Sequence, residues 1–125
     1  MKNKIEHGNA SIDSKDYRQW LIGKFITDKK SLRCTEDLEI KWADCRAGET
    51  RKAWASSKVI HSICILISGK FEMIFSEKNY ILSEPGDYVI WGPGVSHNWK
   101  SITDSIIITV RWPSEPEDSV DIIKP

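Results

Sequence analysis

The sequence predicts a single all-β domain, an antiparallel sandwich or barrel. From Trp20 onward, short apolar segments alternate with Gly, Pro, Asn and charged pairs at a spacing of roughly ten residues, which is typical of strands joined by tight turns. Beyond that point no segment carries a sustained helical apolar period. The chain has 125 residues, the size of one domain that buries its own core.

The strands are expected at residues 20–27, 38–44, 59–68, 71–76, 80–82, 88–91, 97–101 and 105–112. In the second of these, Leu38, Ile40 and Trp42 alternate with charged or small residues, so we expect this apolar trio to face the core and the residues between them to face water. The sequences SGK at 68–70 and EKN at 77–79 predict tight turns that join three strands into a meander. The sequence EPGD at 84–87 predicts a further turn.

The two ends of the chain differ from this central part. Residues 1–19 are polar and predict an arm in which Ser14 caps at most one helical turn, whereas residues 20–112 form the body of the barrel. Residues 113–125 are rich in proline and acids, which predicts a tail that lies on the surface or reaches a partner.

Composition narrows the classes of function. Eighteen basic and eighteen acidic residues cancel, which argues against nucleic acid and membrane surfaces as partners. The N-terminal sequence has no apolar segment of the kind that a secretory signal needs, so we expect a cytoplasmic protein. The cysteines Cys34, Cys45 and Cys64 are odd in number and lack CxxC spacing, which predicts reduced structural thiols.

The segment GDYVIWGPGVSH, residues 86–97, resembles the second motif of the cupin superfamily, in which a histidine points into the barrel. The segment ILISGKFEMIF, residues 65–75, is similar to the hairpin that precedes this motif, and Gly48 with Glu49 stands where the first motif opens. The resemblance covers residues 42–112 and implies a cupin-like double-stranded β-helix, which is a jelly-roll barrel.

The first cupin motif is degenerate. In the family it supplies two histidines and a glutamate as metal ligands, and the matching positions here are Trp54, Ser56 and Ser62. A tightly bound catalytic metal needs three or more ligands, so we expect no metal cofactor; a divalent metal would require ligands rebuilt around His97 and His61. Strand parity opposes this alternative, because His61 points outward if its neighbour Ser62 points inward.

The candidate ligand-binding residues are aromatic, titratable or small polar side chains near the expected barrel interior: His97, Trp99, Tyr88, Ser62, Cys64, Arg51 and Trp54. His97 and Trp99 share a strand face, and an imidazole beside an indole is typical of a small-molecule pocket. Arg51 and Lys70 either meet an anionic ligand or are solvated surface charges. Trp54 contributes to the pocket, the core or a dimer contact.

These features leave three functions open. The first is a small cupin that binds a small organic molecule without a tightly bound metal. The second is an enzyme, either a metal-free isomerase or epimerase using His97 and Tyr88 or a metalloenzyme built on His97 and His61. The third is a structural protein whose barrel is filled by side chains. We also expect a homodimer, because the outward isoleucines of residues 63–67 and the edge strand at 20–27 need an apolar partner.

Overall fold

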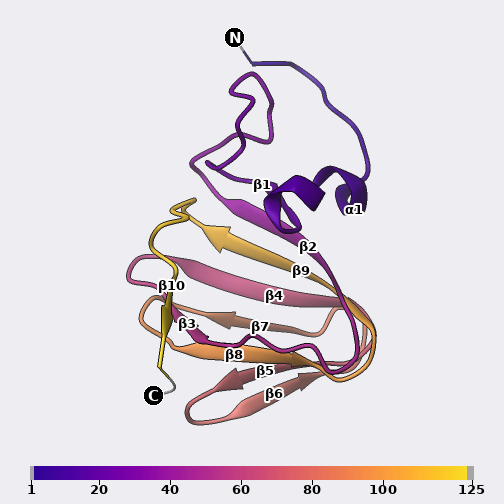
Figure 1. The fold of residues 1–125 in the computed structure, drawn as a ribbon, viewed down its shortest axis with the longest axis vertical. Helices are drawn as coiled ribbons and strands as arrows, with labels where there is room; N and C mark the ends of the chain where they lie inside the picture. Colours follow the sequence, from indigo (N-terminus) through magenta and orange to yellow (C-terminus); the bar gives the residue numbers. More distant parts are fainter. Residues whose placement is uncertain (1, 124–125) are drawn as a thin grey trace.

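The computed structural model describes residues 2–123 and is built almost entirely of β-strands (Figure 1). A short helix α1 (Ala10–Asp13) and a 3-10 turn η1 (Lys15–Tyr17) precede the strands. The strands are β1 (Trp20–Ile22), β2 (Glu39–Cys45), β3 (Trp54–Ser56), β4 (His61–Ser68), β5 (Phe71–Phe75), β6 (Asn79–Leu82), β7 (Tyr88–Trp91), β8 (His97–Ser101), β9 (Ser105–Trp112) and β10 (Val120–Ile122).

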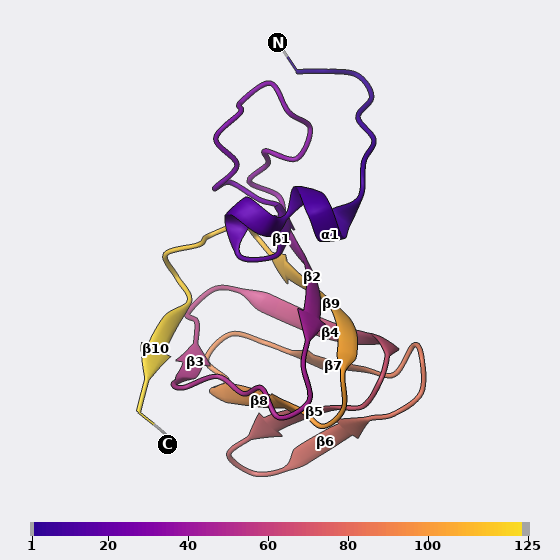
Figure 2. The same ribbon diagram turned by 45° about the vertical axis from the view of Figure 1, so that its right-hand side comes forward.

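Two antiparallel sheets face each other and enclose the interior (Figures 1 and 2). One has the strand order β1-β2-β9-β4-β7, and the other has the order β10-β3-β8-β5-β6. This arrangement confirms the predicted all-β jelly-roll barrel. Within residues 2–123, no helix is long and apolar enough to cross a membrane.

Three of the expected strands have the predicted bounds, namely β7, β8 and β9, whereas two short strands were not predicted. These are β3 and β10, which pair with each other so that Ile122 lies opposite Trp54. Part of the tail therefore adds an edge strand to the second sheet. Strands of three residues are too short to show an alternating pattern in the sequence.

The predicted meander is wrong. Strand β4 pairs with β7 and β9, whereas β5 pairs with β6 and β8, so the turn at Gly69 carries the chain from one sheet to the other. Gly69 has a φ of +90°, and a Cβ at this position would lie 2.2 Å from the carbonyl oxygen of Asp104. A glycine is therefore needed where the chain changes sheet.

The predicted orientation of β2 is also wrong. Ala43 and Cys45 are almost fully buried and belong to the core, and Glu39 is completely buried. Alternation then places Ile40 and Trp42 on the outer face, where both are half-buried. Because α1 packs against β2, part of this outer face is covered by the N-terminal segment, which lets apolar residues lie there.

The apolar core fills one end of the barrel. Its buried members are Ala43, Cys45, Cys64, Leu66, Phe71, Met73, Leu82 and Ile107. The register of β4 places Leu66 beside Ile107 at this end and Ser62 beside Arg111 at the other. The polar end of the interior is therefore the place where a ligand site can form.

Candidate functional site

A cavity of about 80 Å³ lies between the two sheets toward this polar end. Its polar and aromatic lining residues include Trp20, Lys41, Arg51, Ser62, Cys64, Trp91, His97, Trp99, Thr109 and Arg111. The volume exceeds the roughly 30 Å³ that one water molecule occupies and is well below the roughly 300–1,000 Å³ of drug-sized pockets. The cavity therefore suits a ligand of few heavy atoms.

His97 begins β8 and lines the cavity. Its Nδ1 atom lies 3.3 Å from the carbonyl oxygen of Val95, and its ring lies 4.8 Å from the ring of Trp91. Burial lowers the pKa of His97, and the positive charges of Arg51 and Arg111 lower it further. The imidazole is therefore neutral at pH 7 and can donate one hydrogen bond and accept another.

Two further aromatic side chains form the cavity wall beside His97. Trp99 lies on the same strand face as His97 and stacks on Phe71 with ring centroids 5.3 Å apart. Trp91 makes an edge-on contact with Phe75 at 5.6 Å. These contacts fix the orientation of the indoles, so the wall is formed before any ligand enters.

Ser62 and Cys64 both face the cavity from β4, as the sequence predicts. Burial raises the pKa of the Cys64 thiol to about 12, so this side chain is a neutral thiol at pH 7. Cys64 is therefore no nucleophile, since the thiolate is the reactive form.

The expected inward orientation of Tyr88 is wrong. In the pairing of β4 with β7, Tyr88 lies opposite Ile65, whereas the inward Cys64 lies opposite Val89. Neighbouring residues of a strand point to opposite faces, so Tyr88 belongs to the outer face, where it is 61% exposed. Its hydroxyl cannot form an acid–base pair with His97 inside the barrel.

The other candidates are divided between the interior and the outside. Arg51 lines the cavity and pairs with Asp121. Trp54 is buried but is not among the residues that line the cavity, so its expected role in the pocket does not fit the structure. His61 is exposed and stacks on Trp112, with ring centroids 5.7 Å apart.

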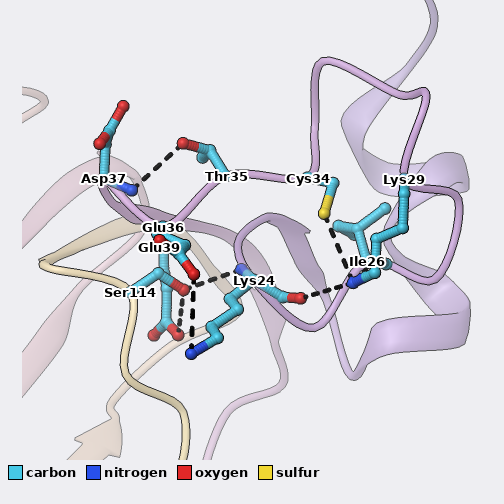
Figure 3. Close-up of polar contacts among 9 residues, drawn as sticks. All are labelled: Lys24, Ile26, Lys29, Cys34, Thr35, Glu36, Asp37, Glu39 and Ser114. Atoms are coloured by element: carbon cyan, nitrogen blue, oxygen red, sulfur yellow. Dashed lines mark hydrogen bonds and ion pairs between the residues drawn. The ribbon is translucent and has the colours of Figure 1, made fainter. Parts of the chain in front are cut away.

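A buried ionic network that was not predicted from the sequence lies at the polar end of the barrel. Glu39 accepts hydrogen bonds from Arg111 Nε at 2.8 Å and from Ser114 Oγ at 3.0 Å. Ser114 Oγ in turn accepts a hydrogen bond from the backbone N–H of Lys24 at 2.8 Å (Figure 3). Through Glu39, Arg111 and Lys24, the network joins β2, β9 and the segment that follows β1. The sequence signal for this network is weak, because Glu39 shares its strand face with a second charged residue, Lys41.

Lys41 is a second interior residue that was not predicted from the sequence. It follows Glu39 by two positions on the inner face of β2, lines the cavity and lies opposite Trp20 of β1. Burial lowers the pKa of Lys41, and Arg111 and Arg51 lower it further. Because the apolar residues of β2 were expected to face the core, Lys41 was expected to face solvent.

The side chains of the cavity do not fit a tightly bound divalent metal. Within residues 2–123, no three His, Cys, Asp or Glu side chains gather in an arrangement that could hold a metal ion. His97 brings an imidazole to the cavity, but Lys41, Arg51 and Arg111 bring positive charge. These charges would repel a divalent cation.

Comparison with known proteins identifies the fold. No protein-family model and no curated protein matches the sequence. Among solved structures, an uncharacterized conserved protein with a double-stranded β-helix domain from Klebsiella pneumoniae has a TM-score of 0.62 at 20% identity, covering 72% of this chain and 78% of that chain. KdgF from Halomonas sp. has a TM-score of 0.57 at 21% identity, covering 66% of this chain and 74% of that chain.

An RmlC-like cupin from Shewanella frigidimarina is also similar, with a TM-score of 0.57 at 17% identity over 66% of this chain and 72% of that chain. These similarities agree with the two facing antiparallel sheets of this chain. The chain therefore has the cupin fold, the double-stranded β-helix that its second motif implied.

Proposed function

We propose that this protein binds a small organic molecule inside its barrel and does so without a tightly bound catalytic metal. The observation that carries the proposal is the position of His97, which lies in a cavity with Trp91 and Trp99 on its walls. Aromatic walls combined with a few oriented polar groups are typical of small-molecule sites.

The geometry favours this function over both enzymes considered from the sequence. A metal-free isomerase needs an acid and a base on opposite sides of its substrate, but Tyr88 lies outside the barrel. A metalloenzyme built on His97 and His61 needs both imidazoles in one site, and His61 lies on the outer face of β4. Neither pair meets in the cavity.

Binding can be tested with a panel of small organic molecules that contains neutral, anionic and cationic members. The titrations use protein dialysed against a chelator, and binding is followed by NMR through the indole N–H signals of Trp91 and Trp99. We expect at least one panel member to shift both signals, and we expect added Zn²⁺ to leave its affinity unchanged.

The histidine variants provide a matched comparison. His97→Ala should weaken binding at least tenfold, whereas His61→Ala, which removes an imidazole from the outer face, should leave it unchanged. The absence of binding by every panel member, or binding that requires added metal, would contradict the proposal.

A further inference from the structure

Lys41 is a cation inside the barrel without an anionic partner, and this indicates the charge of the ligand. We infer that the ligand of the barrel is a small organic monoanion, a carboxylate, that binds the ammonium group of Lys41. The inference rests on the proposed function, because it names the chemical class of the molecule that occupies the cavity.

The position of Lys41 is set by its strand. It lies opposite Trp20 on one side and Thr109 on the other, and all three side chains line the cavity. Its Nζ atom lies 5.6 Å from the centroid of the Trp20 ring. Within residues 2–123, this Nζ atom makes no ion pair with a carboxylate, and it is not a fully buried atom without a partner, so it is accessible to a molecule in the cavity. Lys41 is half-buried, and the loss of water around its charge is unfavourable unless a partner is supplied.

The charges around the cavity leave one positive charge unmatched. Arg111 is paired with the buried carboxylate of Glu39, and Arg51 is paired with Asp121. Lys41 remains as the unmatched cation among these groups. A further acid near Arg111, Asp118, accepts hydrogen bonds from the backbone N–H groups of Lys58 and Val59, so Lys41 is the cavity cation that a monoanion can pair with.

The other titratable groups that face Lys41 do not supply an anion. Burial raises the pKa of Cys45 to about 11 and that of Cys64 to about 12, so both are neutral thiols at pH 7. Burial also keeps His97 neutral. The negative charge opposite Lys41 must therefore come from outside the described chain.

The shape and the chemistry of the cavity favour a carboxylate over an inorganic anion. The indoles of Trp20, Trp91 and Trp99 offer apolar surface to an organic body, and the hydroxyls of Ser62 and Thr109 offer hydrogen bonds to an oxygen atom. A dianion such as hydrogen phosphate would leave one negative charge unmatched. A volume of about 80 Å³ limits the organic body to a short chain.

Propionate and propionamide have nearly the same shape and differ in charge, and propylammonium is a cation of similar size. We expect propionate to bind wild-type protein at least tenfold more tightly than propionamide, and propylammonium to show no binding. NMR titration through the indole signals measures all three affinities. The ammonium signal of Lys41 should also shift as propionate saturates the protein, with its pKa raised by the bound carboxylate.

Two variants test whether Lys41 is the group that recognises the charge of the ligand. Lys41→Met keeps the length of the side chain without its charge and should weaken propionate binding at least tenfold while leaving propionamide binding unchanged. Lys100→Met is the matched control, because Lys100 is exposed on β8, and it should change neither affinity.

The outcomes distinguish this inference from the proposed function. If propionamide binds as tightly as propionate, or if the only panel members that bind are neutral or cationic, the inference is wrong and the proposed function stands. If Lys41→Met retains full propionate affinity, another group binds the carboxylate and the inference is wrong. If no molecule of any charge binds in the barrel, both are wrong.

Discussion

The indole of Trp20 covers the guanidinium group of Arg111, with the Cζ atom 4.2 Å from the ring centroid. Trp20 also faces Lys41, so a single side chain of β1 lies over two cations of the barrel interior. Strand β1 therefore forms one wall of the cavity.

Replacing Trp20 with alanine should weaken both the fold and the site. The change removes two cation–π contacts, each worth about 0.5–2 kcal/mol, so we expect the free energy of unfolding to fall by about 2 kcal/mol. Urea unfolding measures this loss, and propionate titration should show weaker binding. The control is Trp42→Ala, which removes an indole from the outer face of the neighbouring strand and should leave propionate affinity unchanged. If both variants change the affinity equally, Trp20 has no role in the cavity wall.

The buried ion pair between Glu39 and Arg111 should be far more important for stability than the exposed pair between Lys24 and Glu36. Glu39 is fully buried, so Glu39→Gln leaves the guanidinium without its counter-ion and should lower the free energy of unfolding by about 3 kcal/mol. Glu36→Gln removes a pair whose atoms lie 3.8 Å apart in solvent and should cost less than about 1 kcal/mol (Figure 3). Denaturant unfolding of both variants gives the comparison, and equal losses would show that the buried network contributes little.

The stability of the protein should depend on pH through His97. Because burial lowers its folded-state pKa below the ordinary value of 6.5, the unfolded chain binds a proton more readily than the folded one. The free energy of unfolding should therefore decrease as pH falls from 6.5 toward the lowered pKa. In His97→Gln this part of the decrease should disappear, as measured by urea unfolding at several pH values; an unchanged pH profile would show that His97 is not held neutral.

The strands with clear turn signals were predictable from the sequence, whereas strand pairing was less so. The segment from Gly86 to His97 contains the turns and the apolar run that fix β7 and the start of β8. No sequence signal shows that β4 and β5 belong to different sheets. A glycine such as Gly69 fits a hairpin turn and a turn between two sheets equally well. Which sheet a strand joins is decided by tertiary contacts.

Part of the candidate site was also predictable from the sequence. His97, Trp99, Ser62 and Cys64 were placed at the interior from the motif and from strand parity, and all four line the cavity. Lys41 was missed because the alternation in β2 has apolar residues on both faces, and the charged ones were assigned to water. A lysine that lines the interior of a barrel is contrary to the general preference of charged residues for solvent, so only the register with β9 shows its position.

We expect the protein to form a homodimer through the outer face of its first sheet. Ile90 is 55% exposed and Ile67 is 37% exposed on this face, beside the half-buried Ile65. Apolar side chains gathered on one sheet face favour association with a second copy. Light scattering at micromolar concentration should give twice the monomer mass, and Ile90→Lys should reduce it to the monomer mass. A wild-type protein that is monomeric under these conditions would contradict the proposal.

Lys41→Met should make the protein more stable while it weakens the binding of a carboxylate. The folded-state pKa of Lys41 lies below its ordinary value of 10.5, so at pH 7 the ionised side chain destabilises the folded state. Methionine fills a similar volume without this cost, and we expect a gain of about 1 kcal/mol, which raises the Tm by roughly 4 °C for a domain of this size. Calorimetry measures the shift.

The pH dependence of this gain distinguishes relief of a buried charge from better packing. As pH rises from the lowered pKa toward 10.5, the folded wild-type protein loses the proton of Lys41 before the unfolded chain does, so its stability increases. The difference in Tm between Lys41→Met and the wild type should therefore be largest near pH 7 and shrink as the pH approaches 10.5. Saturating propionate should also reduce the difference at pH 7, because it stabilises only the protein that retains the cation. A difference that is constant over this range and indifferent to propionate would show that Lys41 is a structural residue whose charge has no ligand to bind.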